Sequence, residues 1–169
     1  MAKNTLVLTG FMGMGKSTAG PLAAELLKTD YCDTDDWMEA QMGLDVPSLV
    51  KTDMKLFRQL EASALMEVLD LRRGVISTGG GIVSTEIGRS ALLNSGVPVV
   101  WLRAPFEAAE ARVASDSGRE RPLFADVDSA RKLFDERQQW YEATSSHIVD
   151  ASQPALLVAG DIVSILRPH

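Results

Sequence analysis

The sequence contains a single cysteine, Cys32, among 169 residues. One thiol cannot form an internal disulfide, and this scarcity suits a reducing compartment. The chain also lacks an apolar run of about 20 residues, the length that a membrane-spanning helix needs. Its first residues lack the small-residue cleavage site of a signal peptide. We therefore expect a cytoplasmic protein that does not insert into a membrane.

An excess of positive charge is missing as well. The chain has 17 Lys and Arg against 23 Asp and Glu, with a net charge of −6 and an isoelectric point near 4.9. Nucleic-acid binding needs a basic face, so this balance argues against it. The hydrophobic share of 46%, without repeats or low-complexity tracts, suits one domain over residues 1–169. The lack of an obvious exposed apolar stripe favours a monomer.

Short apolar segments alternate with segments of helical spacing. The β-branched, apolar runs predict strands near residues 5–10, 31–33, 75–80, 97–102 and 147–151. The helical spacing predicts helices over residues 22–28, 57–72, 91–93, 105–114, 129–143 and 154–166. This alternation indicates an α/β fold with a five-stranded parallel sheet and helices on both faces.

Two connections are unusually long for this fold class. Residues 33–74 separate two predicted strands and should hold two or three helices, while residues 114–128 are charged and interrupted by Gly118 and Pro122. Long connections often serve as binding segments or lids. We expect a helical substrate-binding excursion at about 33–61 and a lid at about 113–126.

A glycine-rich loop, residues 10–18, follows the first predicted strand and precedes a helix. Its residues GFMGMGKS fit the pattern G-x-x-x-x-G-K-[ST] in full. In such a loop the main-chain N–H groups and the helix dipole hold a polyphosphate, the lysine reaches the β- and γ-phosphates, and the hydroxyl ligates Mg²⁺. The pattern predicts a three-layer P-loop NTPase fold with ATP contacts from Gly13, Met14, Gly15, Lys16, Ser17 and Thr18, Ser17 being also a metal ligand.

Two kinds of nucleotide-binding protein share this loop: NTPase switches or motors, and small-molecule kinases. GTP-binding switches usually carry D-x-x-G and N-K-x-D, and neither string occurs here. ATPase motors usually end a hydrophobic strand in acidic residues, whereas the third predicted strand ends in glycines. We therefore favour a kinase. Gly20 and Pro21 interrupt the helix after the loop without a functional reason in the sequence.

A pair of carboxylates follows the second predicted strand. Asp33 and Asp35 lie at the carboxyl edge of the sheet, where open α/β folds bind ligands. Residues two apart share a face of an extended backbone, so one would serve the metal and the other a substrate hydroxyl. The alternative is that Asp35 or Asp36 caps the next helix.

Arg58 and Glu61 are three apart on a predicted helix. They either pair on its surface or Glu61 holds the Arg58 guanidinium for a substrate carboxylate, which that group binds bidentately. The triple glycine 79–81 ends the third strand and exposes backbone against which a ligand can lie, whereas a structural turn rarely needs three glycines.

The motifs GFMGMGKS, DTD, FRQLE, STGGG, RPL and ERQQWY resemble, in order and approximate spacing, those of the shikimate kinase family, over nearly the whole chain. The resemblance implies the nucleoside-monophosphate-kinase fold. It also implies transfer of the γ-phosphoryl group of ATP to the 3-hydroxyl of shikimate, with Mg²⁺, in the route to chorismate and the aromatic amino acids.

Residue roles are also implied by this resemblance. Lys16, Asp35 and Arg121 are the implied catalytic residues, with Arg121 in the lid and Asp35 either accepting the hydroxyl proton or aiming the hydroxyl. Asp33 belongs to the metal shell with Ser17. The implied shikimate contacts are Asp35, Arg58, Gly80, Gly81 and Arg137. The implied adenine and lid contacts to ATP are Arg112, Arg121, Gln153 and Pro154.

Some positions depart from the family pattern. The family often has Gly-Glu before the Phe-Arg pair, where this chain has residues 53–56, DMKL, and Pro21 stands where a basic residue is common. A second arginine, Arg119, lies near Arg121 in the sequence, so the sequence does not decide which of the two is the main lid arginine. Another small-metabolite kinase, such as gluconate kinase, and a nucleotide-binding regulator without turnover are the alternative functions.

Overall fold

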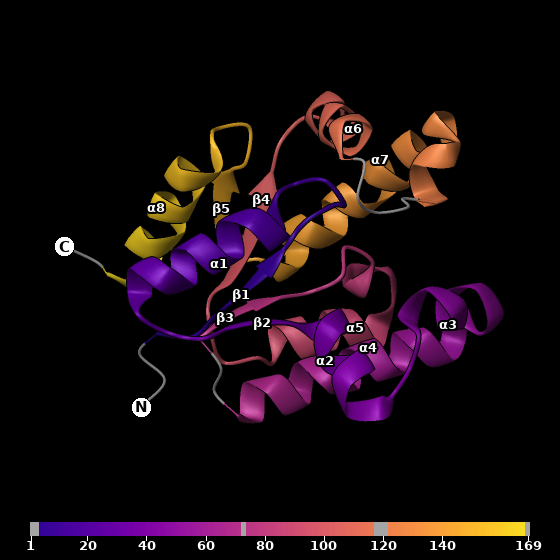
Figure 1. Cartoon of the computed structure of the whole chain (residues 1–169), viewed down its shortest axis with the longest axis horizontal. Helices are drawn as coiled ribbons and strands as arrows, with labels where there is room; N and C mark the ends of the chain where they lie inside the picture. Colours follow the sequence, from indigo (N-terminus) through magenta and orange to yellow (C-terminus); the bar gives the residue numbers. More distant parts are fainter. Residues whose placement is uncertain (1–3, 72–73, 117–121, 168–169) are drawn as a thin grey trace.

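The structure is a computed structural model that describes residues 4–71, 74–116 and 122–167. Its centre is a sheet with the strand order β2-β3-β1-β4-β5, in which every pairing is parallel (Figure 1). The strands are β1 (Leu6–Thr9), β2 (Tyr31–Asp33), β3 (Val75–Ser77), β4 (Val99–Arg103) and β5 (His147–Asp150). The predicted α/β fold with five parallel strands is confirmed.

The central strand β1 is buried on both faces. Leu6 pairs with Val75 of β3, and Val7 pairs with Val99 of β4. Residues Leu6, Val7 and Leu8 have no exposed surface. A continuous apolar strand of this kind needs helices on both sides of the sheet.

Helices cover the two faces of the sheet (Figure 1). Helices α1 (Lys16–Leu27) and α8 (Ala155–Leu166) pack together on one face. The other face carries α4 (Met54–Asp70), α5 (Glu86–Leu93) and α7 (Val127–Thr144), and the short helix η1 (Ile82–Ser84) contacts all three. None of the described helices is long and apolar enough to cross a membrane.

The connection between β2 and β3 holds three helices, as predicted. They are α2 (Thr34–Met42), α3 (Val46–Thr52) and α4. Their contact forms a small apolar cluster of Met38, Val46, Phe57 and Ala64, separate from the main core. This cluster packs α2 and α3 on α4, which also contributes Leu65 and Val68 to the main core.

The predicted lid, residues 113–126, begins in the last turn of helix α6 (Phe106–Ser115) and ends directly before α7. The short helix η2 (Pro122–Ala125) belongs to its second part. Phe124 of η2 stacks on Phe106 with 5.7 Å between ring centroids, and it also meets the ring of Phe11 in the phosphate loop at 6.2 Å. The end of the lid segment is therefore packed against the base of the phosphate loop.

Gly20 and Pro21 both lie inside α1. A Cβ on Gly20 would come within 2.5 Å of Cε2 of Tyr31 on β2. Glycine is thus required because α1 approaches this edge of the sheet closely. This is a packing reason, which the sequence did not reveal; nothing in the structure explains Pro21.

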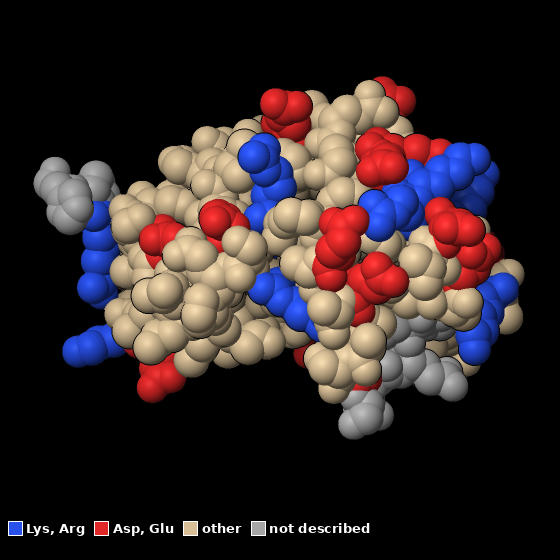
Figure 2. All heavy atoms as spheres, turned by 90° about the horizontal axis from the view of Figure 1, so that it is seen from above, with Lys and Arg blue, Asp and Glu red and all other residues tan. Residues whose placement is uncertain are grey.

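The face seen in Figure 2 carries acidic and basic side chains close to one another. This intermingling accompanies the net charge of −6. On the described part of this face, basic residues do not form one continuous surface of the kind that holds a nucleic-acid backbone.

Candidate active site

A cavity of about 720 Å³ opens at the carboxyl edge of the sheet. The phosphate loop forms its floor, and the ends of β2 and β3, the end of α6 and the loop after β5 form its walls. Of the predicted site residues it is lined by Gly13, Met14, Gly15, Lys16, Ser17, Thr18, Asp33, Asp35, Gly80, Arg112, Gln153 and Pro154. The fold thus gathers both carboxylates and the loop into one space.

The phosphate loop leads directly into α1. Gly13 and Gly15 have φ angles of 82° and 84°, the left-handed region that glycine adopts without strain. Gly15 caps the helix without a side-chain hydrogen bond. The first amides of α1 therefore point out of the helix at the cavity, which is the arrangement that binds an anion.

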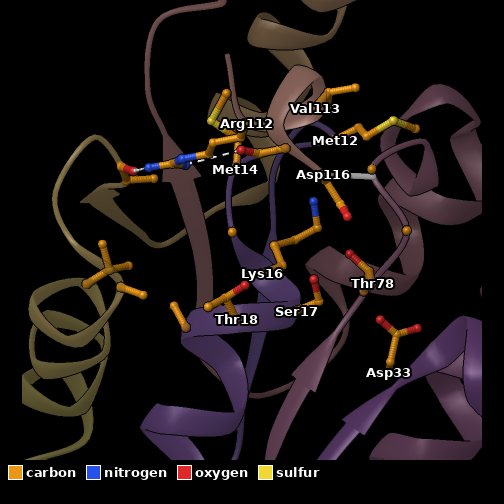
Figure 3. Close-up of a pocket in the computed structure, with 18 of the residues that line it drawn as sticks. Met12, Met14, Lys16, Ser17, Thr18, Asp33, Thr78, Arg112, Val113 and Asp116 are labelled. Atoms are coloured by element: carbon orange, nitrogen blue, oxygen red, sulfur yellow. Dashed lines mark hydrogen bonds between the residues drawn. The ribbon is translucent and has the colours of Figure 1, made fainter. Parts of the chain in front are cut away.

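Lys16 and Ser17 project into this space, as Figure 3 shows. The Lys16 ammonium group donates hydrogen bonds to the carbonyls of Gly10 and Phe11, the latter at 3.0 Å. Ser17 is exposed to the cavity. The side chain of Met14, like that of Phe11, is buried in the core, and the Met14 amide donates to the carbonyl of Phe11 at 3.2 Å.

Asp33 closes strand β2 and caps helix α2. Its Oδ1 atom accepts hydrogen bonds from the amides of Asp35 at 2.8 Å and Asp36 at 3.4 Å. The alternative, that Asp35 or Asp36 would be the cap, is therefore wrong. Burial, followed by the charge of Asp36, raises the pKa of Asp33, and the two amides and Lys16 oppose the rise.

Asp35 stands in the first turn of α2, so the extended backbone assumed for the Asp33–Asp35 pair is also wrong. Both side chains nevertheless line the cavity. Burial raises the pKa of Asp35 to about 7, and the negative charges of Asp33 and Glu61 add to this. Its Oδ1 atom has no hydrogen-bond partner among the described residues.

Arg58 and Glu61 do pair, at 2.9 Å, but not on the surface. Glu61 is 1% exposed and the Arg58 side chain 15% exposed. Burial raises the pKa of Glu61, and the Arg58 guanidinium opposes the rise. The surface-pair alternative is therefore wrong, and Glu61 holds Arg58 within the protein.

The triple glycine lies against this buried pair. A Cβ on Gly79 would be 2.6 Å from Oε1 of Glu61, and one on Gly81 would overlap the guanidinium of Arg58. Only residues without side chains let the two charged groups pack on the turn.

Arg137 comes from α7, far along the chain, and is 5% exposed. Burial lowers the pKa of Arg137, and the positive charge of Arg58 nearby lowers it further. Its guanidinium carbon lies 5.8 Å from the ring centroid of Phe11. Two arginines thus stand close together beside one glutamate, an excess of positive charge suited to a carboxylate ligand.

Arg112 lies at the opposite end of the cavity. Its guanidinium donates to the carbonyl of Gly13 at 3.1 Å and to the carbonyl of Ala151, and it extends away from Lys16 in Figure 3. It thereby joins the phosphate loop to the loop that carries Gln153 and Pro154. Arg119 and Arg121 lie outside the described residues.

The cavity also contains residues that were not predicted from the sequence. Thr78, which follows β3, lines it and bonds the carbonyl of Leu8 at 3.1 Å, and Asp116 at the end of α6 lines the wall near Lys16 (Figure 3). The position of Thr78 just before the triple glycine was an available signal. No pattern marked Asp116.

The sequence model of the shikimate kinase family matches residues 12–167. The chain belongs to the shikimate kinase family. It is 36% identical over 166 residues to the shikimate kinase of Oleidesulfovibrio alaskensis, covering 95% of this chain and 96% of the relative. It is 35% identical over 169 residues to that of Bordetella pertussis, covering 97% and 79%. The resemblance inferred from the motifs is confirmed.

Solved structures of the family share the fold. Shikimate kinase from Acinetobacter baumannii in complex with shikimate superimposes with a TM-score of 0.85, at 28% identity over 97% of this chain and 93% of that one. A gluconokinase from Sinorhizobium meliloti gives a TM-score of 0.57 at 18% identity, with 99% and 98% coverage, and shares the fold alone. The family membership makes this chain a kinase and does not favour the gluconate alternative.

Proposed function

We propose that this protein transfers the γ-phosphoryl group of ATP to the 3-hydroxyl of shikimate. The observation that carries the proposal is the adjacency of a phosphate-binding loop to two arginines, one buried and one partly buried. Gly80 packs on the backbone of that loop, and the next residue, Gly81, packs on Arg58. Shikimate has a carboxylate and ring hydroxyls. The shikimate kinase from A. baumannii, which is similar to this chain, was solved in complex with shikimate.

On the nucleotide side, the loop amides would hold the phosphates and Lys16 would neutralise the γ-phosphate as negative charge redistributes during transfer. Arg112, Gln153 and Pro154 would flank the adenine, because they lie on the same cavity at its far end. Arg121 of the lid would reach the transferred phosphate, and comparing Arg121→Ala with Arg119→Ala would decide which arginine does so.

The donors present suit Mg²⁺. Ser17 and Asp33 are hard oxygen ligands that line the cavity, and the described residues contain no group of three or more His, Cys, Asp or Glu placed to hold a metal. Mg²⁺ is usually held by one or two protein oxygens together with phosphates and water. When bound, it would neutralise phosphate charge.

On the acid side, Arg58 and Arg137 would bind the carboxylate, and the backbone of Gly80 and Gly81 would line the ring. Asp35 would hydrogen-bond the ring hydroxyls and aim the attacking one in line with the γ-phosphate. Fixing two reactants in this way supplies several kcal/mol of the barrier, roughly. A loose transition state needs little base strength, so proton removal by Asp35 is not required.

The test is release of ADP, measured by a coupled assay with shikimate, with gluconate and with buffer alone. We expect Mg²⁺-dependent turnover with shikimate only. Turnover with gluconate would favour the sugar-acid alternative, and nucleotide binding without any turnover would favour a regulator.

We also propose a cytoplasmic monomer. The single cysteine suits a reducing compartment. Sedimentation at micromolar concentration tests the oligomeric state, and a mass of two chains would contradict the proposal.

A further inference from the structure

Tyr141 of helix α7 is fully buried beside the groups proposed to bind the acid. Its hydroxyl donates a 2.6 Å hydrogen bond to the carbonyl of Gly80. Its ring stacks on Trp101 with 5.7 Å between centroids. Phenylalanine would pack in the same way, so the packing alone does not explain the hydroxyl, whereas a buried phenol needs the hydrogen bond that Gly80 provides.

Gly80 is the point at which the phosphate loop and the glycine turn touch. A Cβ here would lie 3.1 Å from the carbonyl oxygen of Gly10 and 3.3 Å from the amide nitrogen of Met12. Tyr141 bonds the Gly80 carbonyl. The turn is thus held between the loop and Tyr141, and any movement of it displaces Gly81 relative to Arg58.

Arg137 lies on the same helix as this tyrosine. The two residues are four apart on α7, so their side chains share a face. Burial raises the pKa of Tyr141, and the positive charge of Arg137 opposes the rise. The face of α7 that bonds the glycine turn is therefore also the face that carries the second arginine.

We propose that Tyr141 is a positioning residue for the organic acid, whose hydroxyl ties helix α7, and with it Arg137, to the Gly80 carbonyl. This inference rests on the proposed function. The tie keeps the second arginine at a fixed distance from the turn that packs on the first. Because two guanidinium groups can bind one carboxylate only when their separation fits it, the tie sets the affinity for the acid. The nucleotide contacts come from the loop backbone and do not depend on it.

Tyr141→Phe tests the inference, since it removes the hydroxyl and keeps the ring. We expect the KM for shikimate to rise about tenfold, as for loss of a buried hydrogen bond next to a charged group. The KM for ATP should stay within about twofold, because the phosphate loop is intact. Equal rises in both KM values, or no rise in either, would overturn the inference.

Tyr31→Phe is the matched control. It removes the same atom from the other tyrosine of the chain, which lies on β2 and also has a buried hydroxyl. We expect both KM values to stay at wild-type levels even where the melting temperature falls. If the wild-type protein shows no turnover with shikimate, the proposed function is wrong. If the wild type turns over and Tyr141→Phe has an unchanged KM for shikimate, only the inference about Tyr141 is wrong.

A measurement on the wild-type side chain keeps the inference testable if Tyr141→Phe does not fold. The chain has only two tyrosines, so labelling with 3-fluorotyrosine gives two fluorine signals, which Tyr31→Phe assigns. Shikimate should shift the Tyr141 signal and leave the Tyr31 signal in place. An unmoved Tyr141 signal at saturating shikimate would overturn the tie.

Discussion

The two halves of the proposed site are built in opposite ways. The phosphate half is one continuous segment, residues 10–18, whose main chain we propose to do most of the binding. The acid half draws Asp35 from α2, Arg58 and Glu61 from α4 and Arg137 from α7, and of these four only Asp35 lines the cavity. A binding site made from backbone is local to its sequence, whereas one made from side chains depends on how distant helices pack.

The halves also differ in how their charges are satisfied. Lys16 bonds to loop carbonyls and Ser17 is exposed. In the acid half, three buried atoms have no hydrogen-bond partner among the described residues: Asp35 Oδ1, Glu61 Oε1 and Arg137 Nε. Such groups destabilise the folded chain. The acid half is therefore preformed at a cost in folding stability. Substitutions in it should change the free energy of unfolding as well as binding.

The largest effect should come from the phosphate half. Lys16→Met is expected to lower kcat about 10³-fold, because it removes a cation positioned for the transition state. The melting temperature should stay unchanged, since Lys16 is not buried. Steady-state kinetics and thermal melting measure the two. Lys132→Met, on the exposed surface of α7, is the control, and wild-type kcat in Lys16→Met would contradict the role of the loop.

Arg58→Ala should affect both binding and folding, in contrast to Lys16→Met. The KM for shikimate should rise about 100-fold through loss of a bidentate partner, while the KM for ATP stays near wild type. Unfolding free energy should fall by about 3–5 kcal/mol, because Glu61 is left buried and unpaired. Shikimate kinetics and urea denaturation test this.

The control for Arg58→Ala is Arg131→Ala. Arg131 pairs with Glu107 at 2.8 Å, but both side chains are exposed. Its loss should change stability by less than about 1 kcal/mol and leave the KM values alone. Equal destabilisation in the two variants would show that burial does not distinguish these pairs.

Arg112→Met should affect the nucleotide and leave the organic acid unaffected, the opposite of Arg58→Ala. Arg112 bridges the carbonyls of Gly13 and Ala151, so its loss should loosen the adenine end and raise the KM for ATP about tenfold. The KM for shikimate should not change. A rise in the shikimate KM alone would contradict the separation of the halves.

The smallest effect should be the change that ionisation of Asp35 makes in the free energy of unfolding as the pH rises. Its folded pKa, raised to about 7, exceeds the unfolded value of about 3.9. Its contribution to stability is therefore fully present below about pH 4 and is lost as the pH rises through 7. Denaturant unfolding without nucleotide or Mg²⁺ should show Asp35→Asn gaining about 1–2 kcal/mol over wild type at pH 8, and little at pH 4. An equal difference at both pH values would contradict the raised pKa.

Much of the fold was predictable because its signals are local. All five strands, the helix α4 and the phosphate loop follow from apolar runs, helical spacing and glycine positions, and the length of the β2–β3 connection indicated two or three helices there. The errors occurred where local geometry depends on a neighbour. Asp33 takes the cap of α2 and places Asp35 in a helix, and Gly20 is set by its contact with Tyr31.

The sequence by itself determined the parallel sheet, the phosphate loop and the residue types that we propose bind the acid. Only the tertiary structure decided that Arg58 and Glu61 pair in the interior and that Arg137 joins them. The physical reason is that burial is a property of the surroundings. A three-residue spacing brings two charges together on any helix, but the glycine turn and α7 remove this pair from water.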